Sequence, residues 1–86
     1  MQSQKVTLPA PNGMHARPAG ELVKLVKSLD GKIMFATEAK EVNASSMLSV
    51  LSLGLKSGAQ FEVKADGGDE QGNLRRVVEF IENIKD

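Results

Sequence analysis

The amino-acid sequence predicts an α+β fold in which a four-stranded antiparallel sheet has three helices on one face. The predicted elements follow the order β-α-β-β-α-β-α, so helices and strands do not strictly alternate as they do in doubly wound α/β proteins. The strand segments alternate apolar and polar residues, which is typical of strands with one buried face. Two longer segments repeat apolar residues at helical spacing. The central β-α-β-β-α-β portion also fits a ferredoxin-like fold.

A loop rich in proline, asparagine and glycine separates the first strand from the first helix. The strand is expected over residues 4–8, where apolar and polar residues alternate. The helix is expected to begin at Ala16 or Pro18, because proline is tolerated in a first turn, and to end at Gly31. Its expected buried stripe consists of Ala19, Leu22, Val23, Val26 and Leu29.

The middle of the chain predicts a β-hairpin followed by a short helix. A strand over residues 32–37 and a shorter strand over residues 40–43 flank a tight turn. A helix over residues 47–53 comes next, and serine is a preferred N-cap residue. Ser45 and Ser46 both precede this helix, so the residues alone leave the choice of cap open.

The last third of the chain predicts a strand and a helix. Residues 60–66 show the clearest alternation in the sequence. The outer face of the sheet is expected to be polar, with Lys5, Thr7, Glu62 and Lys64. After a glycine turn, Asp69 is expected to cap the final helix. The expected buried stripe of that helix consists of Leu74, Val77, Val78, Ile81 and Ile84.

Size and composition restrict what the protein can be. A chain of 86 residues predicts one domain, spanning residues 1–86, with a modest core. Lys and Arg number 11, and so do Asp and Glu, which argues against broad electrostatic binding to nucleic acid. Trp and Tyr are absent, so stacking platforms for single strands are lacking too. With no cysteine and one histidine, neither a disulfide nor a metal site is expected.

The sequence also predicts a cytoplasmic protein. Residues 1–6 lack the apolar core of a signal peptide. The longest apolar-rich segment, from Met47 to Leu55, is too short and too rich in serine to span a bilayer. We therefore expect no membrane insertion and, by default, a monomer.

The only histidine, His15, lies where the first loop becomes a helix. It comes two residues after Gly13 and two residues before Arg17, which precedes Pro18. Helix N-termini attract anions, because their first N–H groups point outward and the helix dipole is positive there. A histidine and an arginine in this position indicate phosphate binding, although an isolated loop histidine is more often a surface residue that caps a helix.

Two segments of the chain resemble signatures of one protein family. Residues 13–19, Gly-Met-His-Ala-Arg-Pro-Ala, resemble the active-site signature of HPr, the histidine-containing phosphocarrier family of the bacterial sugar phosphotransferase system. Residues 42–54 resemble the regulatory-serine segment of that family. The spacing of the two segments, the chain length and the element order agree with the family. The resemblance implies an open-faced β-sandwich, with four antiparallel strands under three helices.

The resemblance implies that His15 accepts a phosphoryl group on its pros nitrogen from Enzyme I and passes it to a sugar-specific IIA domain. It implies that Arg17 stabilises the phosphoryl group, with Ala16 and Pro18 at the helix N-terminus of the site. These residues suit the chemistry, because a neutral imidazole is a nucleophile and a guanidinium offers paired donors to phosphoryl oxygens. No cofactor is expected, and the protein is expected to be a transiently phosphorylated carrier rather than an enzyme.

Ser46 matches the family position that an ATP-dependent kinase phosphorylates. The resemblance therefore implies HPr kinase/phosphorylase and a catabolite-control transcription factor as further partners. A phosphate at a helix N-terminus is electrostatically well placed, so the modification would add charge to the surface without unfolding the helix. Serine is also a common N-cap, and a capping role alone would explain this residue.

The short helix has more apolar residues than a core-facing stripe needs, so some are expected to face outward. The resemblance implies a docking surface for donor and acceptor proteins here. The residues expected to form it are Met47, Leu48 and Leu51, with Met14 as a weaker candidate. Val50 and Leu53 are expected in the core. Lys24 and Lys27 are expected to steer acidic partners, although a solvated helix face would explain them as well.

Three alternatives stay open. A regulatory member of the same family would bind partners without transferring phosphate, although such paralogues lack the histidine. A carrier specialised for a nitrogen-related or fructose branch would share both segments. A small hydrolase of the acylphosphatase type has a similar element order, but Asn12, Gly13 and Arg17 match its glycine-rich loop and arginine poorly.

Overall fold

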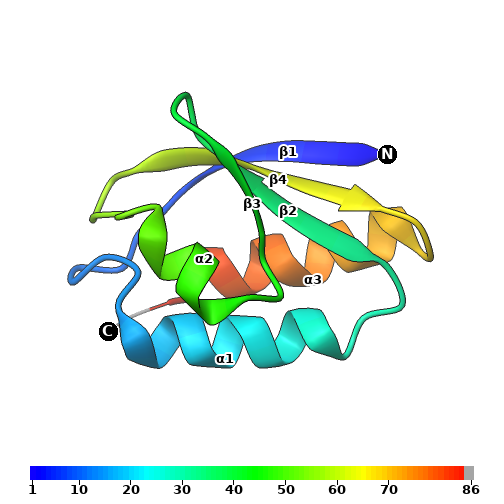
Figure 1. Cartoon of the computed structure of the whole chain (residues 1–86), viewed down its shortest axis with the longest axis horizontal. Coiled ribbons are helices and arrows are strands. Elements are labelled where there is room, and N and C mark those ends of the chain that lie inside the picture. The colour runs from blue at the N-terminus through cyan, green and yellow to red at the C-terminus, as the bar shows by residue number, and fades with distance from the viewer. Residues whose placement is uncertain (85–86) are drawn as a thin grey trace.

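A computed structural model describes residues 1–84 and confirms the predicted α+β class. The sheet forms one layer, and all three helices lie on the same side of it (Figure 1). The predicted order of elements is also confirmed. The elements are β1 (Gln2–Thr7), α1 (Ala16–Lys27), β2 (Lys32–Ala36), β3 (Glu41–Asn43), α2 (Met47–Ser52), β4 (Gln60–Asp66) and α3 (Glu70–Glu82).

The four strands form one sheet in the order β1-β4-β2-β3, and every pair is antiparallel. β4 pairs with β1 on one side and with β2 on the other, so that Val63 lies opposite both Gln4 and Phe35. β3 extends the sheet beyond β2. β1 and β2 both pair antiparallel with β4 and so run parallel to each other on either side of it. In a ferredoxin-like fold the last strand lies at an edge of the sheet, whereas here β4 lies between β1 and β2, so the ferredoxin-like alternative is wrong.

The core lies between the inner face of the sheet and the helices. Ile33, Phe35, Phe61 and Val63 project from this face and are at most 2% exposed. The ring centroids of Phe35 and Phe61 lie 5.1 Å apart with the planes tilted by 57°, an arrangement that aromatic pairs favour. The helices cover this layer with predicted residues: Ala19, Leu22, Val23 and Val26 from α1, and Leu74, Val77, Val78 and Ile81 from α3.

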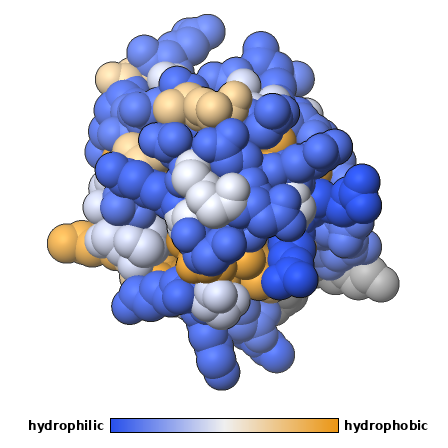
Figure 2. Space-filling view, turned by 90° about the vertical axis from the view of Figure 1, so that its right-hand side faces the viewer, coloured by the Kyte–Doolittle hydropathy of each residue, from blue (hydrophilic) through white to orange (hydrophobic). Residues whose placement is uncertain are grey.

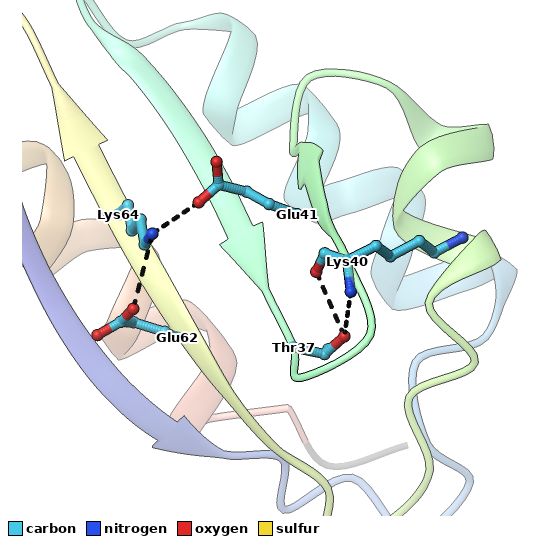
Figure 3. Close-up of polar contacts among 5 residues, drawn as sticks. All are labelled: Thr37, Lys40, Glu41, Glu62 and Lys64. Atoms are coloured by element: carbon cyan, nitrogen blue, oxygen red, sulfur yellow. Dashed lines mark hydrogen bonds and ion pairs between the residues drawn. The ribbon is translucent and has the colours of Figure 1, made fainter.

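The outer face of the sheet is polar, as predicted. The Lys64 ammonium lies 2.7 Å from a Glu41 oxygen and 3.9 Å from a Glu62 oxygen (Figure 3). Its hydrogen bond to Glu41 holds the pKa of Lys64 above its ordinary value. Between β2 and β3, the Thr37 hydroxyl accepts from the Lys40 N–H and donates to the Lys40 carbonyl, both at 3.3 Å (Figure 3). The predicted hairpin is confirmed.

The first helix ends earlier than predicted. α1 stops at Lys27, where the Ser28 N–H donates to the Leu25 carbonyl at 3.0 Å, so the prediction that Gly31 ends the helix is wrong. Gly31 instead lies against Gly67, and a Cβ at position 31 would overlap the Gly67 carbonyl oxygen. This glycine is required by the close approach of two loops.

Other element ends differ from the prediction by one or two residues. β1 begins at Gln2 and ends at Thr7, although the next residue, Leu8, is buried. β2 and α2 each end one residue earlier than predicted, and β3 begins one residue later. Leu29 is only partly buried, whereas Ile84 is buried beyond the end of α3. Within residues 1–84, no helix combines the length and the hydrophobicity that crossing a bilayer requires.

Candidate functional site

His15 is the N-cap residue of α1. Its backbone is extended (φ −95°, ψ −176°), and its carbonyl accepts from the Ala19 N–H at 3.0 Å. The His15 side chain makes no capping hydrogen bond, so the ring is not used to close the helix end. Pro18 has no N–H, and the Ala16 N–H finds no acceptor within residues 1–84. The helix start therefore presents a hydrogen-bond donor and the positive end of its dipole beside the ring.

The two nitrogens of the His15 ring differ in environment. The ring is half-buried, and Nε2 is fully covered with no hydrogen-bond partner among the described residues. Nδ1 is therefore the ring nitrogen that solvent or a partner protein can reach. A neutral imidazole has a proton on one nitrogen and a lone pair on the other. With the proton on Nε2, the accessible Nδ1 presents its lone pair as a nucleophile.

The loop before His15 has a fixed shape. The Gly13 N–H donates to the Ala10 carbonyl at 3.0 Å, and the Met14 N–H donates to the Leu55 carbonyl at 2.8 Å. Gly13 has a positive φ of 71°, and a Cβ on it would lie 2.6 Å from the Leu55 carbonyl oxygen. Only glycine meets both requirements, because it favours the left-handed region and has no side chain to collide. The bond from Met14 to Leu55 places the segment that bears His15 against the loop after α2.

Lys56 lies beside this loop, which the sequence did not predict. A Cβ on Gly13 would lie 3.0 Å from the Lys56 Cα. The two loops are also joined at Leu8, whose N–H donates to the Ala59 carbonyl and whose carbonyl accepts from the Gly58 N–H, both at 2.8 Å. Lys56 is 41 positions from His15 in the chain, so periodicity and local motifs give no signal for this contact.

Ala16, Arg17 and Pro18 form the first turn of α1 after His15. Ala16 and Arg17 are exposed, whereas Pro18 is buried against the body of the protein. Proline fixes φ near the helical value, so the first turn is set before any ligand arrives. The structure therefore places the guanidinium-bearing residue, a helix N-terminus and the histidine together, as predicted from the sequence.

α2 packs beside α1 near the site (Figure 1). A Cβ on Gly20 of α1 would lie 3.9 Å from the Met47 Cε, so the Met47 thioether lies over a position without a side chain. Met47 is 37% exposed and Leu48 is 80% exposed. Leu51 is more covered, because it packs partly against the core. The outward orientation expected for part of this helix is confirmed.

Three further expectations concern apolar residues. Val50 is fully buried, so its predicted place in the core is confirmed. Leu53 is partly buried and packs against the core. Met14 is only 6% exposed, so the expectation that it contributes to a docking surface is wrong. Its backbone N–H donates to the Leu55 carbonyl of a distant loop, a contact that the loop sequence does not reveal.

Ser46, and not Ser45, caps α2. The Ser46 hydroxyl accepts from the Ser49 N–H at 3.3 Å. The Ser45 hydroxyl instead donates to the Asn43 side-chain oxygen at 2.8 Å. The sequence left open which serine caps the helix. Because the Ser45 hydroxyl is bonded to Asn43, Ser46 is the capping residue.

Lys24 and Lys27 lie in the last part of α1 and are both exposed. Cations there are favourable because the C-terminal end of a helix is negative. Within residues 1–84, no group of three or more histidine, cysteine, aspartate or glutamate side chains is placed to hold a metal ion. The end of the molecule where α1 finishes and β2 begins has a mostly hydrophilic surface (Figure 2).

Known proteins similar to this chain form one group. A family model described as "PTS HPr component phosphorylation site" matches residues 2–83. The chain is 33% identical over 85 residues to phosphocarrier protein HPr of Haemophilus influenzae, covering 99% of this chain and 100% of that protein. It is 41% identical over 81 residues to phosphocarrier protein HPr of Lysinibacillus sphaericus, covering 94% and 92% of the two chains. The crystal structure of HPr-C-His from Thermoanaerobacter tengcongensis matches with a TM-score of 0.90 and 30% identity, over 95% and 92% of the two chains.

Proposed function

The chain belongs to the HPr family of phosphocarrier proteins of the phosphotransferase system, and on this premise we propose that His15 is the residue that accepts the phosphoryl group. We propose that Enzyme I is the donor and that sugar-specific IIA domains are the acceptors. The protein would act as a monomeric cytoplasmic carrier whose single domain spans residues 1–86.

The environment of the His15 ring is the observation on which this proposal rests. Nε2 is covered, so the ring can react only through Nδ1, the pros nitrogen. The Nδ1 lone pair forms a bond to the phosphorus of the donor, and the bond between phosphorus and the donor breaks with its electron pair returning to the donor. The proton on Nε2 stays in place. In the onward step the acceptor nucleophile forms the new bond to phosphorus, and the electron pair of the P–N bond returns to Nδ1.

The groups around Nδ1 supply what phosphoryl transfer needs. The protein has little covalent chemistry to perform in such a reaction, and positioning and charge stabilisation dominate. The Ala16 N–H and the N-terminal end of the α1 dipole favour an anion at this position. Arg17 adds a planar guanidinium suited to two phosphoryl oxygens. Pro18 fixes the first turn, so these donors need no rearrangement.

The exposed side of α2 provides the contact for partner proteins in this proposal. Met47 and Leu48 present apolar surface close to the start of α1, and the half-buried Leu51 extends it. Methionine suits a surface that must pack against several partners. Lys24 and Lys27 on α1 would accelerate the approach of acidic partners, because complementary charge raises association rates.

We also propose that Ser46 is a regulatory phosphorylation site for HPr kinase/phosphorylase, with a catabolite-control transcription factor reading the modified form. Its hydroxyl caps α2, so a phosphate there would lie at the positive end of the helix and leave the helix folded. The added charge would lie next to the apolar contact surface of Met47 and Leu48. Phosphorylation of Ser46 would therefore slow the transfer from Enzyme I to His15.

Labelling with phosphoenolpyruvate and Enzyme I tests the proposed role of His15. The wild-type protein should become labelled, and the label should be released by acid, because a phosphohistidine is acid-labile and a phosphoserine is not. His15→Ala should abolish labelling, whereas the matched surface variant Lys5→Gln should be labelled like the wild type. Acid-stable label, or label that persists in His15→Ala, would overturn the proposal.

A further inference from the structure

We infer that Lys56 is a second cation of the phosphoryl site and stabilises the phosphorylated form of His15 alongside Arg17. The inference rests on the proposed role of His15 and assigns a function to a residue on a different segment. Three observations lead to it: the hydrogen-bonded contact between two loops, the glycine that permits the contact, and the balance of charge around the ring.

The loop after α2 is attached to the loop before His15 at both ends. Leu8 exchanges hydrogen bonds with Gly58 and Ala59, and the Leu55 carbonyl accepts from the Met14 N–H, all at 2.8 Å. Lys56 itself is fixed by its carbonyl, which accepts from the Ala59 N–H at 2.9 Å. The backbone of Lys56 therefore keeps a set position next to the segment that bears His15.

Gly13 permits this contact, since a side chain there would push the loops apart. Its Cβ would lie 2.6 Å from the Leu55 carbonyl oxygen and 3.0 Å from the Lys56 Cα. The Lys56 side chain is exposed, and its ammonium has no hydrogen-bond or ion-pair partner among residues 1–84. On its flexible four-carbon stem, this ammonium is available to a phosphoryl group that forms on Nδ1.

The charges around the ring leave room for a second cation. A phosphoryl group brings a charge of about −1.5 to −2 near neutral pH. α1 contributes Arg17, Glu21 and Lys24 within its first three turns, and α2 contributes no charged residue. Arg17 supplies one positive charge two residues after His15. In this inference Lys56 supplies a second one from the loop after α2, so that two cations face the phosphoryl dianion.

A phosphorus NMR titration of the phosphorylated protein tests the inference without any partner protein present. Wild type, Lys56→Gln and Lys56→Arg are each phosphorylated with phosphoenolpyruvate and Enzyme I, and the pKa of the phosphoryl group is measured. Removing the cation in Lys56→Gln should raise that pKa by about 0.4, because the phosphoryl dianion loses a nearby positive charge. Lys56→Arg should restore the wild-type value, and high salt should reduce the difference by screening.

Lys32→Gln is the matched control, because Lys32 is an exposed lysine at the start of β2, beyond the opposite end of α1. It should leave the phosphoryl pKa unchanged. Equal phosphoryl pKa values in wild type and Lys56→Gln would overturn the inference, and slower transfer with unchanged pKa would assign Lys56 to partner contact instead. Failure of the wild type to become phosphorylated would overturn the proposed role of His15 itself, so the two failures are distinguishable.

Discussion

Gly13 shows how a single residue without a side chain can determine the presentation of His15. Its positive φ and its contact with the Leu55 carbonyl both exclude a Cβ. The sequence places Gly13 in a loop, but the reason for the glycine lies in Leu55 and Lys56, which are distant in the chain. Two glycines with positive φ can therefore have different roles, depending on what lies next to them.

Gly13→Ala should destabilise the protein more than Gly58→Ala does. Both glycines have positive φ, at 71° and 82°, so both variants meet the left-handed penalty of about 1–2 kcal/mol. A Cβ on Gly58 has nothing within 4 Å, whereas a Cβ on Gly13 collides with backbone. The collision should add about 1–3 kcal/mol for Gly13→Ala, as overpacking does. Urea denaturation of the two variants measures the difference, and equal losses of unfolding free energy would contradict this account of Gly13.

At the scale of elements, α2 combines a structural cap with a proposed regulatory site in one residue. Ser46 closes the N-terminus of a helix of six residues, and such a short helix depends on its cap and its packing. Leu48 faces outward and Val50 faces the core, so the helix both anchors the fold and presents a surface. Capping and regulation therefore need variants that separate them.

Ser46→Ala and Ser46→Asp separate the two roles. Ser46→Ala removes the acceptor for the Ser49 N–H and should lower the unfolding free energy by about 1 kcal/mol while leaving the rate of labelling unchanged. Ser46→Asp keeps a capping oxygen, so its stability should stay within about 0.5 kcal/mol of wild type. Its added charge should slow labelling by Enzyme I about fivefold, the effect of one unfavourable contact of about 1 kcal/mol. Unchanged labelling of Ser46→Asp would contradict the regulatory proposal.

Asp30 joins the loop after α1 to the start of α3. Its carboxylate accepts from the Asn73 side-chain amide at 2.8 Å and from the Asp69 N–H at 3.2 Å. The bond from Asn73, followed by that from Asp69, holds the pKa of Asp30 below its ordinary value of 3.8. A lowered pKa in the folded state means that the ionised carboxylate favours folding. The contribution is complete above pH 3.8 and disappears as the pH falls through the lower pKa of the folded state.

Asp30→Asn should therefore be less stable than wild type at neutral pH, and the difference should shrink below pH 3.8. Chemical denaturation at neutral and acidic pH measures this difference in unfolding free energy. Glu38→Gln serves as the control. It removes a carboxylate on the exposed turn between β2 and β3, away from the hydrogen bonds that join Asp30 to Asp69 and Asn73. A difference between wild type and Asp30→Asn that stays constant across this pH range would rule out the carboxylate as its cause.

In the molecule as a whole, the sequence predicted the strands and the buried helix faces, which depend on periodicity. It did not predict the loop contacts between distant segments. Alternation located β4 at its observed bounds, and helical spacing identified the buried stripes of α1 and α3. The family resemblance, drawn from residues 13–19 and 42–54, is confirmed. The roles assigned to His15, Arg17 and Ser46 stay predictions.

The missed features share one physical cause. Gly31 was predicted to end the first helix, but its role is to let Gly67 approach. The position of Lys56 beside Gly13 appears only when the two loops are folded together. Met14 was expected as a weaker candidate for the docking surface, yet it is buried, and its backbone N–H donates to the Leu55 carbonyl. Each depends on a backbone contact between segments far apart in the chain, which residue type and spacing do not encode.

In the proposed function, the accessible Nδ1 of His15 holds the transferred phosphoryl group. The most direct measurement is NMR of the ¹⁵N-labelled protein after phosphorylation by phosphoenolpyruvate and Enzyme I, which identifies the nitrogen coupled to phosphorus. Because Nε2 is covered in the folded protein, the coupling should be found at Nδ1 of His15. Coupling at Nε2, or phosphate on any other residue, would show that Nδ1 of His15 is not the phosphoryl acceptor.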